Sequence, residues 1–510
     1  MEIHFSQFAF LLSLSLFIFM LLKLATTKTN HQRHLNLPPG PRKFPFIGNL
    51  HILAASSRLP HHSLRDLAAK YGPVMHLQLG EIPTVVISSS ESAKEVMRTQ
   101  DLSFASRPSI LAAETLLYGS TDIAFSPYGP YWRQMRKIAT QELLSPKRVQ
   151  SFKHIREAEF LNLCKWIASN EGCSINLTEK IISTKYDIVS RLSLGEKTNE
   201  QAAFVSVLTE VVEVFSGFYV SDLYPSMKWM SMINGLKPRL DRLHKESDRI
   251  LEQIIQQRIL MRAVGDGNHE EDLLDLLLKL QDDDDLELSL TMDNVKAVIL
   301  AIFFGGSETS STTTDWAMSE MLKNPEVMKK AQYEVRQLFD GKGGCVDESC
   351  FDELNYLKSV IKETLRLHPS LPLLLPRECR ETCEISGYNI PLKTRVMVNA
   401  WAIGRDPKYW GPHAESFVPE RFMEDSSSVD FMGNDFQYIP FGAGRRICPG
   451  ISYGLANVET QLALFLYHFD WSLPGEMKRE EIDMTEAFGA TARRKNKLYV
   501  VPTVMRPLPV

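Results

Sequence analysis

The chain has 510 residues, and its 57 Lys and Arg against 62 Asp and Glu give a formal net charge of -5. Hydrophobic residues make up 44% and charged residues 23% of it, which is ordinary for a globular protein and excludes a disordered chain, a collagen-like fibre and a multi-span membrane protein. The acidic balance argues against nucleic-acid binding, and seven scattered cysteines do not form the pattern of a disulfide framework.

An uncharged apolar run begins the chain. Residues 5–22 contain no charged side chain, and about 20 apolar residues span a bilayer as a helix. A cleaved signal peptide is the alternative, but its usual basic start is missing, since Glu2 stands there instead. We therefore expect residues 1–25 to form a transmembrane signal anchor. Lys23, Lys28 and Arg33 follow the run, which places the rest of the protein on the cytosolic side.

A basic, proline-rich segment follows over residues 26–45. Pro38, Pro39, Pro41 and Pro45 fix their backbone angles and disfavour helix in the preceding residue. This segment is expected to be a stiff, extended hinge between the anchor and the body.

Residues 46–510 show neither a second linker nor an internal repeat, so they predict one large domain. Helical periodicity dominates it, and strand patterns are short. The expected helices cover residues 153–166, 240–262, 291–322, 325–339 and 451–467, and the expected strands cover 74–79, 84–88 and 395–399. The sequence therefore predicts a mainly α fold with a small β-sheet region.

The helix expected over 291–322 contains two adjacent glycines. Gly305 and Gly306 each cost about 1 kcal/mol relative to alanine in a helix interior. Such a cost is accepted where a ligand needs room or a helix bends, and Glu308 and Thr309 would then offer a carboxylate and a hydroxyl for proton relay. The alternative is a glycine pair that lets another helix pack closely, with Thr309 bonded within its own helix.

Residues 440–450 combine three glycines, two arginines and one cysteine. A thiolate that binds a metal needs nearby donors or positive charge, and Cys448 would lie just before the positive end of the helix expected over 451–467. Arginine also binds carboxylates through two parallel hydrogen bonds. The residues alone leave two readings open, a metal-binding thiolate and a glycine-rich loop with a buried free cysteine.

The pattern Phe441-x-x-Gly444-x-Arg446-x-Cys448-x-Gly450 resembles the haem-binding signature of the cytochrome P-450 monooxygenases. That resemblance implies a single domain that encloses haem, with Cys448 as the axial ligand of the iron and Phe441, Arg446 and Gly450 beside the cofactor. It also implies that Glu308 and Thr309 relay protons to bound O2.

Other motifs of the family follow in order. Glu363 and Arg366 match its E-x-x-R helix, and Arg421 in the Pro-Glu-Arg-Phe segment resembles the third member of a buried charge network. Trp132 and Arg136 match the W-x-x-x-R helix and imply contact with one haem propionate. Arg377 resembles the strand residue that contacts the other propionate.

The resemblance is closest to the plant microsomal subgroup that oxidises terpenoids and indole alkaloids, through residues 376–380, 401–407 and 431–436. It implies an endoplasmic reticulum membrane protein that takes electrons from a separate NADPH-dependent flavoprotein reductase and hydroxylates a hydrophobic substrate, most simply a terpenoid. The substrate pocket expected from the family's segments consists of Leu111, Phe215, Phe218, Leu300, Ile302, Gly305, Leu371, Leu375 and Phe488.

Three alternatives belong to other substrates or classes. The same chemistry could act on an indole alkaloid. A haem-thiolate isomerase or dehydratase would need no O2, but it would not need Glu308 and Thr309 either. A secreted binding glycoprotein would use residues 5–22 as a signal and Asn176 as a glycosylation site.

Overall fold

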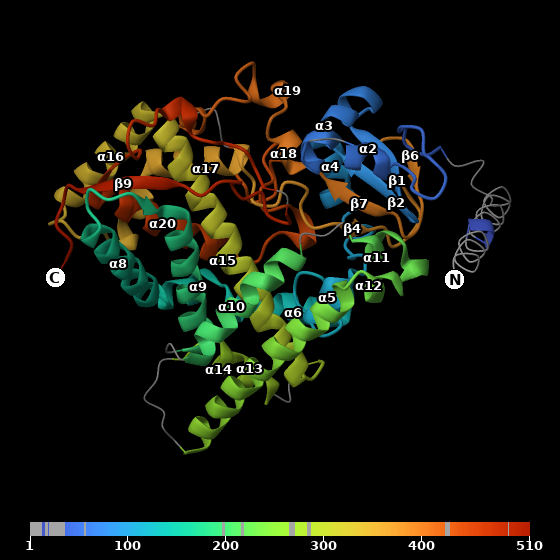
Figure 1. Ribbon diagram of the computed structural model, residues 1–510, viewed down its shortest axis with the longest axis horizontal. Coiled ribbons are helices and arrows are strands. Elements are labelled where there is room, and N and C mark those ends of the chain that lie inside the picture. The colour runs from blue at the N-terminus through green and yellow to red at the C-terminus, as the bar shows by residue number, and fades with distance from the viewer. Residues whose placement is uncertain are drawn as a thin grey trace, which may run out of the picture.

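The computed structural model describes residues 13–15, 19, 36–55, 58–195, 199–215, 219–264, 271–282, 287–423, 429–487 and 489–509. Helices dominate these residues, and the main sheet lies at one side of the molecule, where α2 (Leu50–Ala55) and α3 (Pro60–Tyr71) cover it (Figure 1). The expectation of a mainly α fold with small sheets is confirmed.

The long helices include all five that the sequence predicts. Four of them are one to six residues longer than expected, and α15 keeps the expected length but begins and ends one residue later. They are α6 (Pro130–Ile138), α8 (Lys153–Ser169), α9 (Leu177–Leu194), α10 (Asn199–Val214), α13 (Leu236–Val264), α14 (Leu273–Gln281), α15 (Met292–Lys323), α16 (Pro325–Asp340), α17 (Asn355–Leu367) and α20 (Ile451–His468). Shorter helices connect them, namely α4 (Ser90–Lys94), α5 (Leu111–Leu116), α7 (Pro146–Ser151), α11 (Val220–Leu223), α12 (Met230–Ile233), α18 (Ala400–Ile403) and α19 (Pro407–Trp410).

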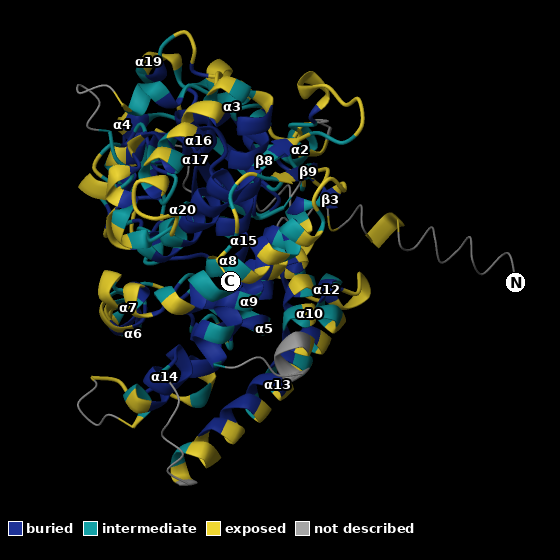
Figure 2. Cartoon of the chain, turned by 90° about the vertical axis from the view of Figure 1, so that its left-hand side faces the viewer, coloured by how far each residue is buried: buried dark blue, intermediate teal, exposed yellow. Residues whose placement is uncertain are grey.

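Helix α15 forms the centre of the fold. Thr291 caps its start, because the Thr291 side chain accepts from the Asn294 N–H at 3.3 Å while the Asn294 side chain accepts from the Thr291 N–H at 2.9 Å. Helices α9, α17 and α20 pack around it, so most of its side chains are buried on every face. Figure 2 shows this buried centre and the exposed edge of α13. The central position of α15 lets one of its faces border an interior cavity.

The main sheet has the strand order β1-β2-β7-β4, with β1 (Val74–Leu79), β2 (Ile82–Ile87), β7 (Arg395–Val398) and β4 (Arg377–Glu378). Strands β2 and β7 pair in parallel with Thr84 opposite Arg395, whereas the other pairs are antiparallel. The two strands predicted at 84–88 and 395–399 are present with slightly different ends. Two smaller sheets contain β5 (Cys383–Ile385) with β6 (Tyr388–Ile390), and β3 (Ile175–Asn176) with β9 (Tyr499–Val504) and β8 (Phe469–Ser472).

The expected anchor over residues 1–25 lies outside the described residues except for 13–15 and 19. Among the helices that the structure describes, none has the length and apolar character needed to cross a membrane. Within the expected hinge, residues 36–43 form neither helix nor strand. The Pro39 carbonyl accepts from the His76 N–H of β1 at 2.8 Å, and a Cβ on Gly40 would collide with the His76 carbonyl. This end of the hinge is therefore packed against the main sheet.

Candidate functional site: an arginine-rimmed cavity with a cysteine in its wall

Cys448 lies in a tight loop that leads directly into α20. The Cys448 N–H donates to the Phe441 carbonyl at 3.0 Å, and the Gly450 N–H donates to the Cys448 sulfur at 3.4 Å. Burial raises the pKa of the Cys448 thiol, while the Gly450 N–H and the Arg136 charge oppose that rise. Because burial prevails over these donors, a bound metal cation is the natural partner for an ionised sulfur here.

A glycine fixes the path of this loop. Gly444 has φ +69°, and a Cβ there would collide with the Met97 carbonyl. The next N–H, of Arg445, donates to an Asp101 carboxylate oxygen at 2.8 Å. These contacts join the cysteine loop to η2 (Glu95–Thr99) and the residues after it.

An interior cavity of about 260 Å³ separates this loop from α15. Its lining is mostly apolar and comes from α6, α15, the segment 365–377 and the cysteine loop. Of the residues singled out from the sequence, the lining includes Trp132, Arg136, Ile302, Gly305, Thr309, Leu371, Leu375, Arg377, Phe441, Arg446, Cys448 and Gly450. These residues from four distant parts of the sequence therefore meet at one cavity.

Four guanidinium groups line the same cavity, and burial lowers the pKa of each. They belong to Arg107, Arg136, Arg377 and Arg446, and the pKa of Arg446 falls to about 9. In the described chain, Asp101 offsets part of this charge, with an oxygen 3.2 Å from Arg377. A cavity that concentrates desolvated cations in this way suits a ligand with carboxylate groups.

Arg446 has a buried N–H group that lacks a hydrogen-bond acceptor among the described residues. Its Nε donates to the Ala105 carbonyl at 2.7 Å and its Nη2 to the Ser126 carbonyl at 2.6 Å, but its buried Nη1 has no hydrogen-bond partner in the structure. The guanidinium stacks on the Trp132 ring at 4.1 Å, and the Trp132 N–H donates to the Ile123 carbonyl at 3.1 Å. The propionates of haem would supply acceptors at this rim, and the Cys448 thiolate would supply the iron ligand, so the residues present fit haem.

No sequence pattern predicted a role for Arg107. Its three contacts are the carbonyls of Ala124, Leu375 and Pro376, at 2.9, 2.7 and 2.9 Å. Two of these carbonyls lie more than 260 residues away along the chain. Only the folded chain brings this guanidinium to the cavity.

The two adjacent glycines of α15 have different surroundings. A Cβ on Gly305 would meet open space at the cavity, whereas a Cβ on Gly306 would lie 3.0 Å from the Tyr453 ring of α20. Both readings of the glycine pair therefore apply, one to each residue. The Thr309 hydroxyl borders the cavity and donates to the Gly305 carbonyl at 2.7 Å.

Glu308 lies outside the cavity lining. One of its oxygens accepts from the Tyr186 hydroxyl at 3.2 Å, and the other lies 3.6 Å from an Arg493 nitrogen. Burial raises the pKa of Glu308, and Arg493 and Tyr186 oppose that rise. The adjacent Glu308 and Thr309 therefore point in different directions, and in this arrangement only the hydroxyl reaches the cavity.

The remaining pocket residues expected from the sequence are spread over the surrounding core. Leu300 is buried in a cluster with α9 and α14, and Leu111 packs beside α13. Phe215 lies against Phe125 and Phe304, with ring centroids 5.7 and 5.3 Å apart. These three do not line the cavity. Phe218 and Phe488 lie outside the described residues.

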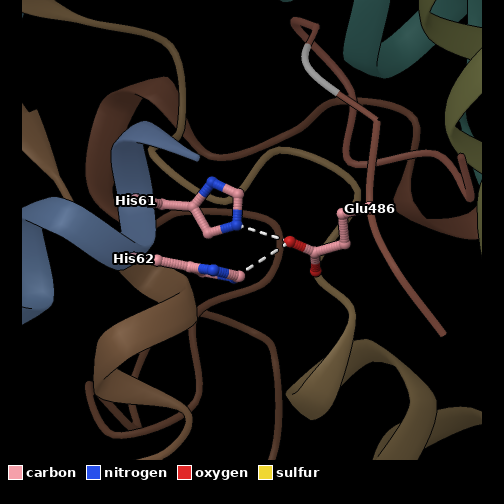
Figure 3. A group of neighbouring side chains, drawn as sticks. All are labelled: His61, His62 and Glu486. Carbon is pink, nitrogen blue, oxygen red and sulfur yellow. Dashed lines mark hydrogen bonds and ion pairs between the residues drawn. The ribbon is translucent and has the colours of Figure 1, made fainter. Parts of the chain in front are cut away.

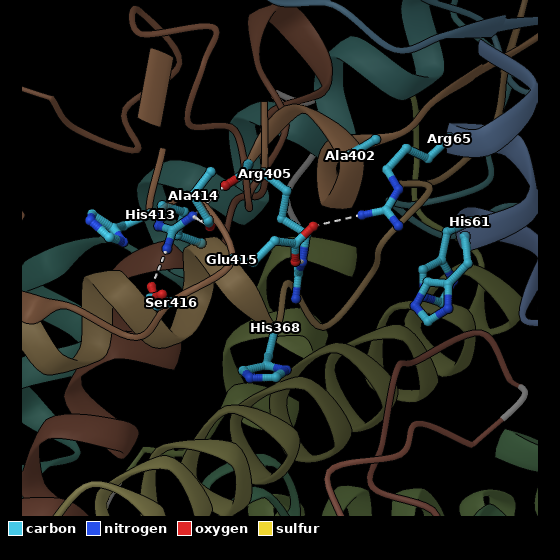
Figure 4. A network of polar contacts seen from close by, with 12 residues as sticks. His61, Arg65, His368, Ala402, Arg405, His413, Ala414, Glu415 and Ser416 are labelled. Atoms are coloured by element: carbon cyan, nitrogen blue, oxygen red, sulfur yellow. Dashed lines mark hydrogen bonds and ion pairs between the residues drawn. The ribbon is translucent and has the colours of Figure 1, made fainter. Parts of the chain in front are cut away.

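Glu363, Arg366 and Arg421 meet in a buried network. Arg366 donates twice to the Glu363 carboxylate, at 2.6 and 2.8 Å, and Arg421 donates to it at 3.0 Å. The other Arg366 N–H groups donate to the carbonyls of Gly404, Ala414 and Ser416. Figure 4 shows Ala414 and Ser416 beside Glu415, which joins Arg405 at 3.0 Å and Arg65 of α3 at 2.7 Å. The network links α17 to the segments that precede the cysteine loop.

Comparison with known proteins identifies the family. Residues 38–500 match the family model of cytochrome P-450. The chain belongs to the cytochrome P-450 family. Its relatives include salviol synthase of Salvia pomifera, 52% identical over 509 residues and the full length of both chains. Premnaspirodiene oxygenase of Hyoscyamus muticus is 49% identical over 98% of this chain and 99% of that protein. Tabersonine 6,7-epoxidase isoform 1 of Catharanthus roseus is also 49% identical, over 98% of each chain.

Solved structures agree with this family. A zebrafish cytochrome P-450 with abiraterone superimposes with a TM-score of 0.74 at 25% identity, covering 88% of this chain and all of that one. The protein is therefore a cytochrome P-450 monooxygenase, an oxidoreductase whose cofactor is haem with a thiolate ligand. The cavity lined by Cys448 and the four arginines is the site that would hold this cofactor.

Proposed function

We propose that the protein uses NADPH and O2 to hydroxylate a hydrophobic plant specialised metabolite, most simply a terpenoid. One oxygen atom enters a C–H bond of the substrate, and the other leaves as water with two protons and the two electrons that NADPH supplies. The observation that supports this reaction best is the cavity that places the Cys448 sulfur and the Thr309 hydroxyl in its lining.

The residues that line the cavity have different roles in holding haem. Cys448 supplies the thiolate, and the Gly450 N–H together with the start of α20 stabilises its negative charge. Trp132, Arg136, Arg377 and Arg446 hold the propionate edge, and we add Arg107 to this group. Bound haem supplies the activation of O2, a chemistry that no side chain of the protein provides.

Thr309 and Glu308 carry protons in this proposal. The Thr309 hydroxyl can give up its bond to the Gly305 carbonyl and donate into the cavity. Glu308 would reprotonate it after a side-chain rotation away from Arg493, because burial raises the pKa of this carboxyl and so favours its protonated form. This use of O2 distinguishes the proposal from a haem-thiolate isomerase or dehydratase.

The substrate class rests on the lining and on the relatives. Ile302, Leu371 and Leu375 give the cavity an apolar wall that suits a hydrocarbon-like ligand. Salviol synthase and premnaspirodiene oxygenase favour a terpenoid. Tabersonine 6,7-epoxidase, which is about equally similar, makes an indole alkaloid the second candidate.

Electrons would come from a separate NADPH-dependent flavoprotein reductase. Arg445 is half-exposed beside the cysteine loop and offers positive charge to an acidic partner. We also propose that residues 1–25 anchor the protein in the endoplasmic reticulum membrane as a single span, that residues 26–45 act as a hinge, and that the domain over 46–510 faces the cytosol.

The central test is spectroscopic. The reduced, CO-bound protein should show the Soret band of a thiolate-ligated haem, and Cys448→Ala should abolish it. Cys164→Ala is the matched control, because Cys164 is a buried cysteine that is not part of the cavity lining and should leave the band in place. A thiolate band that survives in Cys448→Ala would refute this ligand assignment. Reductase-supported turnover of a panel of terpenes and alkaloids, followed by mass spectrometry, then separates the two substrate classes.

A further inference from the structure

Two cysteines face each other between β4 and β5. The sulfur atoms of Cys379 and Cys383 lie 3.7 Å apart, which is direct contact. Cys379 is fully buried, whereas Cys383 is partly exposed. Neither cysteine belongs to the cavity lining, so the pair is distinct from the haem site.

Backbone pairing holds both cysteines in place. The Cys379 N–H donates to the Thr394 carbonyl at 2.9 Å, and the Cys379 carbonyl accepts from the Lys393 N–H at 2.8 Å. Cys383 begins β5 and pairs with Ile390 of β6. Because the chain is anchored at both cysteines, the contact between their sulfur atoms does not depend on a freely moving loop.

The two thiols form a hydrogen bond with each other. The hydrogen bond between them lowers the pKa of Cys379 despite its burial, and the same bond together with burial raises the pKa of Cys383. The pair therefore loses its first proton more readily than its second. A thiolate in contact with a second sulfur is the arrangement that thiol–disulfide exchange requires.

We propose that Cys379 and Cys383 form a reversible disulfide by exchange with a small-molecule disulfide such as glutathione disulfide. The Cys379 thiolate accepts the proton of the Cys383 thiol across their hydrogen bond, and the accessible Cys383 sulfur attacks one sulfur of glutathione disulfide. One glutathione leaves as its thiolate and takes up that proton from Cys379. The Cys379 thiolate then attacks the Cys383 sulfur, and the second glutathione leaves. The two protein thiols lose two electrons and two protons, and these convert glutathione disulfide to two glutathione thiols.

The bond would join the residue that follows β4 to the first residue of β5. The sulfur atoms must close from 3.7 Å to about 2.05 Å for this bond to form. Arg377, whose guanidinium lines the cavity, precedes Cys379 by two residues on β4. Oxidation would therefore tie the strand that presents Arg377 to the β5–β6 hairpin.

The test uses full-length, haem-loaded protein equilibrated in glutathione buffers of increasing oxidising strength. Free thiols are alkylated, and the digested protein is examined by mass spectrometry. We expect the peptide that spans residues 379–383 to escape alkylation, to lose the mass of two hydrogens, and to return to the dithiol form with dithiothreitol. The exposed Cys173 should be alkylated or carry glutathione instead.

Two variants isolate the exchange. In Cys379→Ser, Cys383 should stop at the glutathione adduct, and in Cys383→Ser, Cys379 should remain a free thiol. The reduced CO spectrum of each variant verifies that it has folded around haem. Alkylation of both cysteines in the wild-type protein under excess glutathione disulfide, or a persistent glutathione adduct on Cys383, would overturn the proposal.

Discussion

In our proposal Thr309 donates a proton into the cavity, because it lines the cavity and its hydroxyl donates to the Gly305 carbonyl of its own helix. We expect Thr309→Ala to keep consuming NADPH while product per NADPH falls by about tenfold or more, since the last proton donor is lost. Parallel measurement of NADPH oxidation and product gives this ratio. Thr309→Ser, which keeps the hydroxyl, should stay near the wild-type ratio, and equal coupling in the alanine variant would remove Thr309 from the proton path.

Arg493 controls the charge of Glu308 in the same proposal. Burial raises the pKa of Glu308, and Arg493 at 3.6 Å is the larger of the two influences that lower it. Arg493→Gln removes that influence, so the pKa of Glu308 should rise further and its carboxyl should stay protonated to higher pH. The pH profile of product formation should move to higher pH, while Arg493→Lys should leave it near its wild-type position. Identical profiles for the two variants would contradict the coupling.

At the scale of elements, a buried charge network fastens α17 to the approach of the cysteine loop. Glu363 and Arg366 are both fully buried. Arg366→Ala leaves the Glu363 carboxylate with one charged partner and leaves three backbone carbonyls without the donor they have in the wild-type protein. Loss of one member of such a buried pair lowers the free energy of unfolding by about 3–5 kcal/mol. We expect a large drop in the urea midpoint of haem release, followed at the Soret band. Arg421→Lys, at the more exposed partner, should lower it less, and the reverse order would contradict this account.

The C-terminal segment around residues 483–495 joins the sheet side of the molecule to α15. An oxygen of Glu486 lies 2.6 Å from His61 Nε2 and 3.2 Å from His62 Nε2, at the start of α3 (Figure 3). A few residues later, the Ala492 carbonyl accepts from the Trp316 indole at 2.7 Å. His61, His62 and Glu486 each present one atom that can bind a metal ion, but the positive end of α3 favours the Glu486 carboxylate over a cation. These contacts therefore hold the C-terminal segment against the start of α3.

At the scale of the whole molecule, the described residues of the catalytic domain form several hydrophobic core clusters. The buried residues of these clusters run from 64 onward. Deletion of residues 1–25 should therefore leave the reduced CO spectrum unchanged while it moves most of the protein out of the membrane pellet. Sedimentation of expressed full-length and truncated protein measures this directly. A variant that lacks only residues 26–35 should remain in the pellet, and an unchanged pellet fraction for the first deletion would contradict the anchor.

Much of this protein could be read from short-range patterns. The cysteine loop, the E-x-x-R pair and the helix ends depend on residues within a few turns of one another, so spacing predicts them directly. The helix over Met292–Lys323 and the neighbours of Cys448 were predictable for this reason. The substrate lining was less so, because Leu111 and Leu300 have the same apolar character as true lining residues.

The tertiary structure decided what spacing leaves open. Arg107 became part of the arginine rim only because it contacts carbonyls more than 260 residues away. Glu308 turned from the cavity because Tyr186 and Arg493 reach its carboxylate from other elements. The sequence by itself thus determined the family, the cofactor and five of the long helices, since these rest on local pattern, whereas α9, α10 and α14 were not predicted. Which side chains face the cavity depended on long-range packing, which no local pattern contains.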